Sequence, residues 1–413
     1  MPSVQHVPGR RSSVKTIEAW LAEWRGNAAV YYAKRLSGND TGLTGAHQAG
    51  LYLPVGLVRQ LCPGWEGVPA PGMTLPMTLD SDGEEERDLR LVWYNEKTRN
   101  EGRLTRWGGR SSPMQDVERT GALTVLAFHK STPPANPEAL AVWICRDEAE
   151  EAAVETIFGA VEPGQVRWVS HPGTGGGTVQ PTPVLDKESR ILARIPPEWS
   201  VRFPTGAEVL ELAVSLAEDG ARRTADQLLL HRRKWEYDLF QVVEKTHVLP
   251  TVAAGFTAVD EFLLFALTVT NRRKSRAGRS LELHLARIFR DCRVSFENGS
   301  VSELNKRPDF LFPAGGYANA RFPDPLLRML AVKTTCKDRW RQVLSEADRI
   351  PHKHLFTLQE GVSLPQLMEM ENSGLSLVVP RSHFPSFPVE ARDRLLDLEG
   401  FVNELRALGA VSD

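Results

Sequence analysis

The distribution of apolar and polar positions along the chain changes near residue 197. Before this point, short β-prone runs between Gly, Pro and Asn residues predict strands at 89–93, 122–128 and 139–145. After it, apolar residues recur at helical spacing in the segments 207–216, 225–245, 259–269 and 281–289. The pattern therefore predicts a mainly β first part and a second part that begins with long helices.

Strand-like and helical runs alternate in the last third of the chain. Asp309–Phe312 and Arg328–Thr335 are predicted strands, and Leu330 and Val332 of the second strand lie on the face opposite Lys333. The next segment is predicted to be a helix, because these apolar residues have helical spacing: Trp340, Val343, Leu344 and Ala347. With further strands near residues 356 and 378, this alternation predicts an α/β domain with a mixed sheet.

Two carboxylates and a lysine fall at the ends of these elements. Asp309 opens the first strand, Lys333 follows the apolar run of the second, and Glu346 lies on the predicted helix. Carboxylates on neighbouring elements can bind Mg²⁺, while a lysine can polarise a phosphodiester and steady an attacking water. This set is typical of a metal-dependent nuclease. The alternative is a plain α/β unit whose charged residues are solvated ends of strands and helices.

Length and charge set further bounds. A chain of 413 residues is long enough for two domains, and a formal net charge of -2 argues against a uniformly basic surface for nucleic acid. We expect a tail at 1–15, a first domain at 16–170, a linker at 171–188 and a second domain at 189–413. The sequence shows neither the apolar core of a signal peptide nor an apolar run of membrane-spanning length, so we expect a cytoplasmic protein without membrane contact.

A local basic cluster lies in the first part of the chain. Its cations are interleaved with Trp107 and are Lys97, Arg99, Arg103, Arg106 and Arg110. Cations among polar residues and an aromatic side chain suit contact with phosphates and guanine edges. The alternative is a solvated basic loop, which is common on any protein surface.

Several long, aperiodic stretches are more specific than any spaced motif. They are MLAVKTTCKDRWRQVLSEAD and HLFTLQEGVSL around the candidate site, NRRKSRAGRSLELHL before it, and SGNDTGLTGAHQAGLYLP, KTRNEGRLTRWGGRSSPMQD and TGALTVLAF in the first part. From about Trp20 onward, the chain closely resembles the EcoRII-like family of type IIE restriction endonucleases. The resemblance implies an N-terminal effector domain, a B3-like β-pseudobarrel, and a C-terminal catalytic domain with the α/β restriction-endonuclease-like fold, a PD-(D/E)xK variant.

The resemblance implies roles for the candidate site. In the common PD-(D/E)xK pattern a carboxylate stands two residues before the lysine, where this chain has Ala331. Some restriction endonucleases supply this second metal ligand from the following helix, where Glu346 stands. Asp309 and Glu346 are then the Mg²⁺ ligands, Lys333 orients water, and Glu282 accompanies the site. Glu282 could equally be an exposed helix glutamate.

The resemblance also implies DNA-reading residues in the second domain. Lys337, Asp338 and Arg339 are similar to a basic–acidic–basic triplet with which related CCGG and CCNGG enzymes read adjacent C:G pairs. Alternatively, Asp338 caps a helix, and Lys337 could face the scissile phosphate. Arg233 and Tyr237, one helical turn apart, match a pair that holds an extruded base in relatives. Tyr237 could instead be a core residue.

In the effector domain, the resemblance marks these residues as DNA contacts: His47, Tyr52, Lys97, Arg99, Glu101 and Arg103. Gly102 stands where the family has Lys, so one contact is missing or replaced. The resemblance therefore implies that effector affinity or specificity differs in this chain.

The function implied is that of a type II (type IIE) restriction endonuclease that hydrolyses double-stranded DNA with Mg²⁺, ahead of a 5′-CCWGG site. It would be a homodimer through its C-terminal domain, and a palindromic site matches two-fold symmetry. It would need two or more site copies, because the effector domain covers the catalytic cleft. One alternative is a non-cleaving, sequence-specific DNA-binding regulator. Another is a nuclease of mismatch or transposon processing.

Overall fold

The structure is a computed structural model that describes residues 15–24, 28–45, 50–83, 86–95, 100–129, 136–170 and 185–410. Only the backbone is described at Ala28, Ala29, Arg110, Leu185, Asp186 and Asp338.

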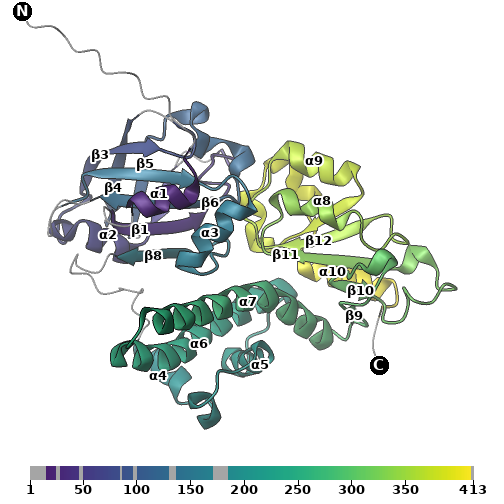
Figure 1. Cartoon of the computed structure of the whole chain (residues 1–413). Helices are drawn as coiled ribbons and strands as arrows, with labels where there is room; N and C mark the ends of the chain where they lie inside the picture. Colours follow the sequence, from purple (N-terminus) through teal and green to yellow (C-terminus); the bar gives the residue numbers. More distant parts are fainter. Residues whose placement is uncertain are drawn as a thin grey trace, which may run out of the picture.

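The first part of the chain is built on an eight-stranded sheet with the order β2-β5-β4-β3-β7-β6-β1-β8 (Figure 1). Neighbouring strands are antiparallel except for the parallel pair β3 and β7. The strands are β1 (Ala28–Arg35), β2 (Leu51–Leu53), β3 (Gly72–Leu79), β4 (Arg87–Tyr94), β5 (Glu101–Thr105), β6 (Leu123–His129), β7 (Ala139–Ile144) and β8 (Val166–Ser170). The strands predicted at 89–93, 122–128 and 139–145 are confirmed as β4, β6 and β7.

Helices cover both faces of this sheet. Trp20 of α1 (Ile17–Trp24) and Phe158 of α3 (Glu148–Phe158) pack with Trp143 on one face, while α2 (Val55–Leu61) packs on the other. Short 3-10 segments complete the part: η1 (Pro63–Trp65), η2 (Gly109–Ser111), η3 (Pro113–Gln115) and η4 (Val117–Arg119). The sequence pattern predicted mostly strands here and missed α1 and α3.

A layer of helices follows, drawn below the two sheets in Figure 1. It contains α4 (Leu185–Leu192), η5 (Pro197–Ser200), α5 (Gly206–Ala217), α6 (Ala225–Ala254) and α7 (Val259–Asp291). The segments predicted at 259–269 and 281–289 are the two ends of the single helix α7. The polar stretch between them stays helical because Arg273 and Arg276 pair with Glu244 and Glu236 of α6. No helix among the described residues is long and apolar enough to cross a membrane.

The last part contains a five-stranded sheet with the order β13-β12-β11-β10-β9. β9, β10 and β11 are antiparallel, whereas β11, β12 and β13 are parallel, so the predicted mixed sheet is confirmed. The strands are β9 (Glu297–Asn298), β10 (Phe310–Phe312), β11 (Arg328–Lys333), β12 (Lys353–Thr357) and β13 (Leu375–Val378). The remaining elements are η6 (Glu303–Asn305), η7 (Asp324–Leu326), η8 (Lys337–Arg339), α8 (Trp340–Val343), α9 (Leu364–Asn372), η9 (Arg381–Ser386), η10 (Val389–Arg394) and α10 (Leu398–Ala407).

The prediction that the helix after β11 extends to Glu346 is wrong. α8 ends at Val343, and Glu346 lies in the bend that follows. Ala347 has a φ of 49°, which a right-handed helix cannot contain. The Asp348 N–H donates to the Glu303 carboxylate at 3.2 Å, which holds the chain in this turn. A turn, and not a helix, therefore sets the position of Glu346.

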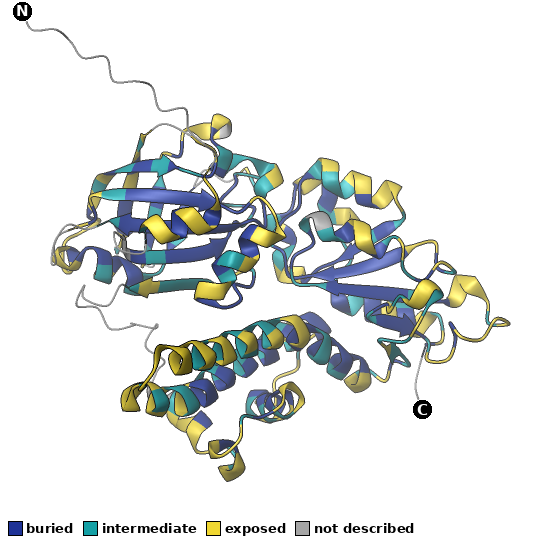
Figure 2. Cartoon of the chain, viewed as in Figure 1, coloured by how far each residue is buried: buried dark blue, intermediate teal, exposed yellow. Residues whose placement is uncertain are grey.

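The two parts of the chain have separate hydrophobic cores (Figure 2). The apolar clusters of the described residues lie either within 17–168 or within 191–410, and none of them contains residues of both parts. A region with its own core can fold alone. The linker predicted at 171–188 lies outside the described residues up to 184, and α4 begins at Leu185, inside that predicted range. The predicted domain bounds otherwise stay a prediction.

Candidate active site

Asp309 precedes β10 and is fixed by backbone contacts on two sides. Its carbonyl oxygen accepts hydrogen bonds from Gly299 N at 3.1 Å and from Asn298 Nδ2 at 2.9 Å. Its carboxylate Oδ2 accepts from Val332 N of β11 at 2.7 Å. The apolar residues Phe310–Phe312 are buried in the core. The chain therefore enters β10 with a carboxylate held against the neighbouring strand β11.

Lys333 is the last residue of β11, so this strand ends two residues earlier than predicted. Leu330 and Val332 pack in one cluster and Ala331 in another, which confirms the predicted faces of the strand. The distance between Lys333 Nζ and Asp309 Oδ2 is 3.8 Å. The two side chains are 27% and 19% exposed, so both remain accessible to a substrate.

Glu346 belongs electrostatically to the same group. Burial and the negative charge of Asp309 raise the pKa of Glu346 to about 7, although Lys333, Lys306 and Lys353 act in the opposite direction. Burial also raises the pKa of Asp309, while Lys333 and the Val332 N–H lower it. The chain thus holds two carboxylates together where negative charge is disfavoured.

Glu282 of α7 faces this group from the helical layer. Burial and the charge of Asp309 raise the pKa of Glu282, while Lys333 and Arg279 lower it. The structure therefore brings Glu282 near Asp309 and Lys333. A residue that accompanies the active site is expected to lie there.

The carboxylates fit a divalent cation. No group of three His, Cys, Asp or Glu residues in the described part of the chain forms a ready-made metal centre. Oxygen ligands from one or two carboxylates are, however, what Mg²⁺ takes from proteins, with water and phosphate oxygens in the other positions. Burial is the main cause of the raised pKa values of Asp309 and Glu346, and a bound cation would favour the charged form of both carboxylates.

Two lysines near Glu346 were not predicted. Lys306 Nζ donates to Ser345 O at 2.5 Å, and the buried Lys353 donates through Nζ to Ile350 O at 2.6 Å. Both lower the pKa of Glu346. Lys306 and Arg307 form a basic pair just before Asp309, and this pair was the feature of the sequence that could have identified Lys306. Lys353 opens the buried strand β12, where a charged residue is uncommon.

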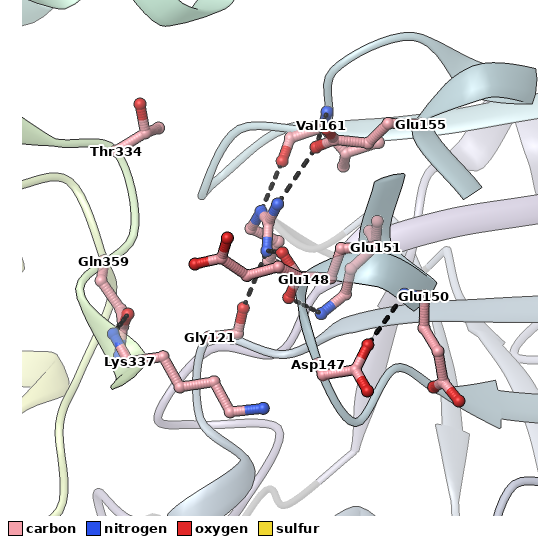
Figure 3. Close-up of polar contacts among 12 residues, drawn as sticks. Gly121, Asp147, Glu148, Glu150, Glu151, Glu155, Val161, Thr334, Lys337 and Gln359 are labelled. Carbon is pink, nitrogen blue, oxygen red and sulfur yellow. Dashed lines mark hydrogen bonds and ion pairs between the residues drawn. The ribbon is translucent and has the colours of Figure 1, made fainter. Parts of the chain in front are cut away.

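Lys337 and Arg339 of the predicted DNA-reading triplet face the first domain, and Figure 3 shows the Lys337 side chain directed toward the start of α3. Lys337 Nζ lies 3.5 Å from Arg146 O, and Arg339 Nε donates to Glu148 Oε1 at 2.5 Å. The side chain of Asp338 lies outside the described atoms. Glu148, Glu150 and Glu151 form the acidic first turn of α3. The cations of the triplet therefore lie against an acidic helix terminus.

Gln359, which the sequence reading missed, holds this turn in place. Its Oε1 accepts from Cys336 N at 3.0 Å and from Lys337 N at 3.2 Å. Its Nε2 donates across the domain boundary to Thr120 O at 3.3 Å. Gln359 is 1% exposed, so its amide joins the triplet to the first domain inside a buried contact.

Arg233 and Tyr237 of α6 also contact the first domain. Arg233 Nη2 donates to Glu162 Oε2 at 2.5 Å, and Arg233 Nη1 donates to Ser280 Oγ at 3.0 Å. The Arg167 guanidinium lies 4.8 Å from the centre of the Tyr237 ring. Tyr237 is partly exposed and not a core residue. The pair lies one helical turn apart, as predicted, beneath the end of the first domain.

The predicted effector residues that the structure describes lie together on β2 and β5. Tyr52 and Arg103 are partners in the strand pairing, and the Arg103 guanidinium lies 5.7 Å from the Tyr52 ring centre. Arg103 also donates to Glu101 and to Gly50 O. Gly102 faces the core, since a Cβ there would lie 2.4 Å from Val58 Cγ2. His47, Lys97 and Arg99 lie outside the described residues.

Two family models match this chain. Residues 26–172 match the N-terminal domain of restriction endonuclease EcoRII, and residues 240–402 match the EcoRII C-terminal domain. The type II restriction enzyme EcoRII of Escherichia coli is 44% identical over 402 residues, covering 95% of this chain and 97% of the relative. The chain belongs to the EcoRII family of type II restriction enzymes. It is a site-specific deoxyribonuclease, so the alternative of a non-cleaving regulator is set aside.

Remote similarities to solved structures have lower scores. A restriction endonuclease PspGI–substrate DNA complex has a TM-score of 0.42 and 15% identity, covering 51% of this chain and 95% of that one. Metal-depleted Ecl18kI in complex with uncleaved DNA has a TM-score of 0.42 and 17% identity, covering 54% of this chain and 83% of that one. We assign no residue from these two similarities.

Proposed function

We propose that this EcoRII-family enzyme cleaves double-stranded DNA with Mg²⁺ at the group formed by Asp309, Lys333 and Glu346. Asp309 and Glu346 would hold the cation, which supplies charge neutralisation at the phosphate and acidifies a bound water. Lys333 would steady the attacking water and stabilise the charge that develops on the phosphorane. The approach of Lys333 Nζ to within 3.8 Å of Asp309 Oδ2 is the observation that carries this proposal.

The proposed site is 5′-CCWGG. Lys337 and Arg339 would donate to guanine O6 and N7, while Asp338 would accept from a cytosine amino group. Arg233 and Tyr237 would hold a base extruded from the centre of the site. Glu282 would support Lys333 from α7. These roles rest on the resemblance and, for Lys337 to Arg339, on their position shortly after the end of β11.

The proposed assembly is a homodimer through the C-terminal domain. A second copy matches the two-fold symmetry of a palindromic site. An exposed apolar surface on α7 supports it, since Val259, Leu263, Leu264 and Leu267 are 74%, 54%, 67% and 55% exposed. Exposed apolar patches of this kind mark protein contacts.

The proposed role of the first domain is that of a B3-like effector domain, which binds a further copy of the site through Tyr52, Glu101 and Arg103, with His47, Lys97 and Arg99. Gly102 does not lie on the same face as Arg103, because it packs against Val58. A substitution of the family lysine by glycine here would therefore change core packing as well as any DNA contact.

We further propose that the effector domain inhibits the catalytic domain until it binds DNA. Glu162 and Glu148 of the effector domain pair with Arg233 and Arg339, the cations proposed to read DNA. DNA cannot contact these guanidinium groups until the carboxylates leave. The linker proposed at 171–188 would permit this displacement.

A digestion tests the proposed reaction and site. Plasmid DNA with several 5′-CCWGG sites is incubated with the enzyme and Mg²⁺, and the cut ends are sequenced. The proposal predicts cuts ahead of the first cytosine of each site and no cleavage with EDTA. Ends at any other sequence would contradict the proposed specificity, while cleavage in EDTA would contradict the proposed metal dependence.

A further inference from the structure

The connection between β9 and β10 folds back on itself just before Asp309. At its base, Gly299 N donates to Asp309 O at 3.1 Å. Further out, Ser302 donates to Lys306 O through its N–H at 2.8 Å and through its hydroxyl at 3.3 Å. The residues 302–306 therefore form a closed tip, which we call the hairpin tip.

The backbone of the hairpin tip is strained at its two central residues. Leu304 has a φ of 55° and Asn305 a φ of 59°, in the left-handed region that residues other than glycine rarely adopt. The Leu304 side chain is 85% exposed, so its own burial does not offset this strain. Strained backbone persists where surrounding contacts hold it in place, and such sites are often functional. The residues that flank the strained pair, Glu303 and Lys306, make contacts of this kind.

Both flanking side chains contact the turn that follows α8. Lys306 Nζ donates to Ser345 O at 2.5 Å, and Asp348 N donates to Glu303 Oε2 at 3.2 Å. One contact lies one residue before Glu346, and the other lies two residues after it. The hairpin tip therefore holds the chain on both sides of this carboxylate.

The same contacts take the place of hydrogen bonds that would continue α8. In an α-helix, each N–H donates to the carbonyl oxygen four residues earlier. Asp348 N and Ser345 O would both belong to that pattern if α8 continued. Here the Asp348 N–H donates to Glu303, and Ser345 O accepts from Lys306. The helix therefore ends early, and Glu346 lies in a bend.

We propose that Lys306 and Glu303 are positioning residues, which hold Glu346 near Asp309 so that the two carboxylates can share a divalent cation. Asp309 is fixed by the Val332 N–H of β11, whereas Glu346 lies outside any helix or strand and needs this support. Metal ligands are commonly held in place by a second layer of contacts. This role rests on the metal-binding function proposed above for Glu346, whereas the contact between the hairpin tip and the turn does not.

A purely electrostatic role of Lys306 predicts an effect of the opposite sign. The Lys306 ammonium group interacts with the charge of Glu346. A positive charge beside a cation site repels the cation, so loss of this charge alone would tighten cation binding. Loss of a positioning contact weakens it. The direction of the change therefore distinguishes the two roles.

Electron paramagnetic resonance of free Mn²⁺ measures cation binding to the full-length protein, with Asp309→Asn defining the binding elsewhere on its surface. Lys306→Met keeps the aliphatic chain and should weaken Mn²⁺ binding about tenfold, as expected for loss of a charge-assisted hydrogen bond. Lys306→Arg keeps a donor and should restore most of the affinity. Arg307→Gln is the matched control, because Arg307 contacts Gly299 O of its own hairpin, and it should bind Mn²⁺ at least as tightly as the parent.

A double variant tests whether Lys306 acts through Glu346. Lys306→Met added to Glu346→Gln should bind Mn²⁺ no more weakly than Glu346→Gln alone, because the positioned carboxylate is already lost. A further tenfold loss in the double variant would overturn the proposal, and so would unchanged or tighter binding by Lys306→Met alone. If Glu346→Gln binds Mn²⁺ as the parent does, the metal-binding function proposed for Glu346 is wrong, and the positioning role falls with it.

Hydrogen exchange tests the contact of the hairpin tip without a metal. The segment 344–349 should exchange about tenfold faster in Lys306→Met and in Glu303→Ala than in the parent, because each variant loses a contact that holds the turn. Glu303→Gln should exchange more slowly than Glu303→Ala, since its amide oxygen can still accept from Asp348 N. Leu304→Gly relieves strain, leaves both contacts in place and should exchange as the parent does. Unchanged exchange in Lys306→Met and Glu303→Ala would overturn the proposal even if Glu346 binds the cation.

Discussion

Glu162 of the first domain lies between two arginines of the second domain, 2.5 Å from Arg233 Nη2 and 3.3 Å from Arg276 Nη2. All three side chains are almost fully buried. Although burial raises the pKa of Glu162, Arg233 and Arg276 lower it overall, so this carboxylate is charged. Removing one partner of a buried pair leaves the other charge uncompensated, which is costly. The contact therefore favours the arrangement in which the two domains lie against each other.

Loss of this carboxylate should activate the enzyme. Glu162→Gln keeps the shape of the side chain but removes its charge, and should accelerate cleavage of single-site DNA by about 5- to 150-fold, the range of ordinary coupling energies. Glu371→Gln is the matched control, because Glu371 pairs with Arg394 inside the catalytic part and should have no such effect. The rate of cleavage of a supercoiled plasmid with one site measures both.

A steric variant tests the boundary between the two domains at a second contact, without changing charge. Gly38 has no positive φ, and a Cβ added there would lie 2.3 Å from Ser386 O of the catalytic part. Gly38→Ala should separate the two domains and act in the same direction as Glu162→Gln. Gly64→Ala, where a Cβ meets no atom within 4 Å, is its control. Unchanged or slower single-site cleavage by both activating variants would show that these contacts do not inhibit.

Substitution of the catalytic group should separate chemistry from binding. Asp309→Asn and Lys333→Ala should each reduce cleavage by about 10²- to 10³-fold or more, because each removes a charge that acts on the phosphate or water. Binding of the site in a gel-shift assay without Mg²⁺ should persist. Asp309→Asn retains an oxygen that can accept from Val332 N, so the fold should not change.

Substitutions of Glu346 and Glu282 show which of the two carboxylates is the second metal ligand. Glu346→Gln should be as inactive as Asp309→Asn, whereas Glu282→Gln should lose less activity. The reverse order would make Glu282 the second ligand. Near-normal cleavage by Lys333→Ala would disprove the assignment of the whole group.

The strands of this site could be predicted from the sequence, since Phe310–Phe312 and Arg328–Val332 carry a local apolar pattern. The structure places Glu346 near Asp309 and Lys333, but the helix predicted to carry it is wrong, because the turn depends on Glu303, which is distant in sequence. Gln359 and Glu162 were missed for a similar reason. Thr120, one partner of Gln359, and Arg233, which pairs with Glu162, lie in the other domain in each case, and nothing in the local pattern marks a residue whose contacts cross the domain boundary.

Asp338 should read a base pair. Asp338→Ala removes an acceptor for a cytosine amino group and should cost about 1–3 kcal/mol of discrimination at that position. Binding to nonspecific DNA should stay the same or tighten slightly, because a negative charge near phosphate is lost. Competition binding with sites altered at single positions measures the effect. Unchanged preference would mean that Asp338, which lies within η8 and not at its cap, reads no base.

Protonation of His383 should destabilise the fold. Burial lowers the pKa of His383 to about 4, whereas an unfolded histidine titrates near 6.5. The unfolded state then binds more protons between these values, so the stability contributed by neutral His383 is present above about pH 6.5 and falls as pH decreases toward 4. The loss is at most about 1.4 kcal/mol per pH unit.

A variant isolates this contribution from the carboxylates that titrate in the same range. The free energy of unfolding of the His383→Gln variant should decrease less steeply with falling pH than that of the parent. Urea unfolding at several pH values from 7 to 4.5 measures this. Parallel curves for the two proteins would mean that His383 is protonated to the same extent in the folded and unfolded states.

The proposed inhibition by the first domain is tested most directly by removing that domain. The catalytic part has its own hydrophobic cores within 191–410, so a protein that starts at Leu185 should fold. Arg103→Ala and Arg99→Ala in the full-length chain should weaken effector-site binding and leave the enzyme poorly active on two-site DNA. The decisive measurement is the initial rate of cleavage of a single-site plasmid by the full-length and shortened proteins. Our account predicts that the shortened protein is faster; a shortened protein that is slower would contradict it.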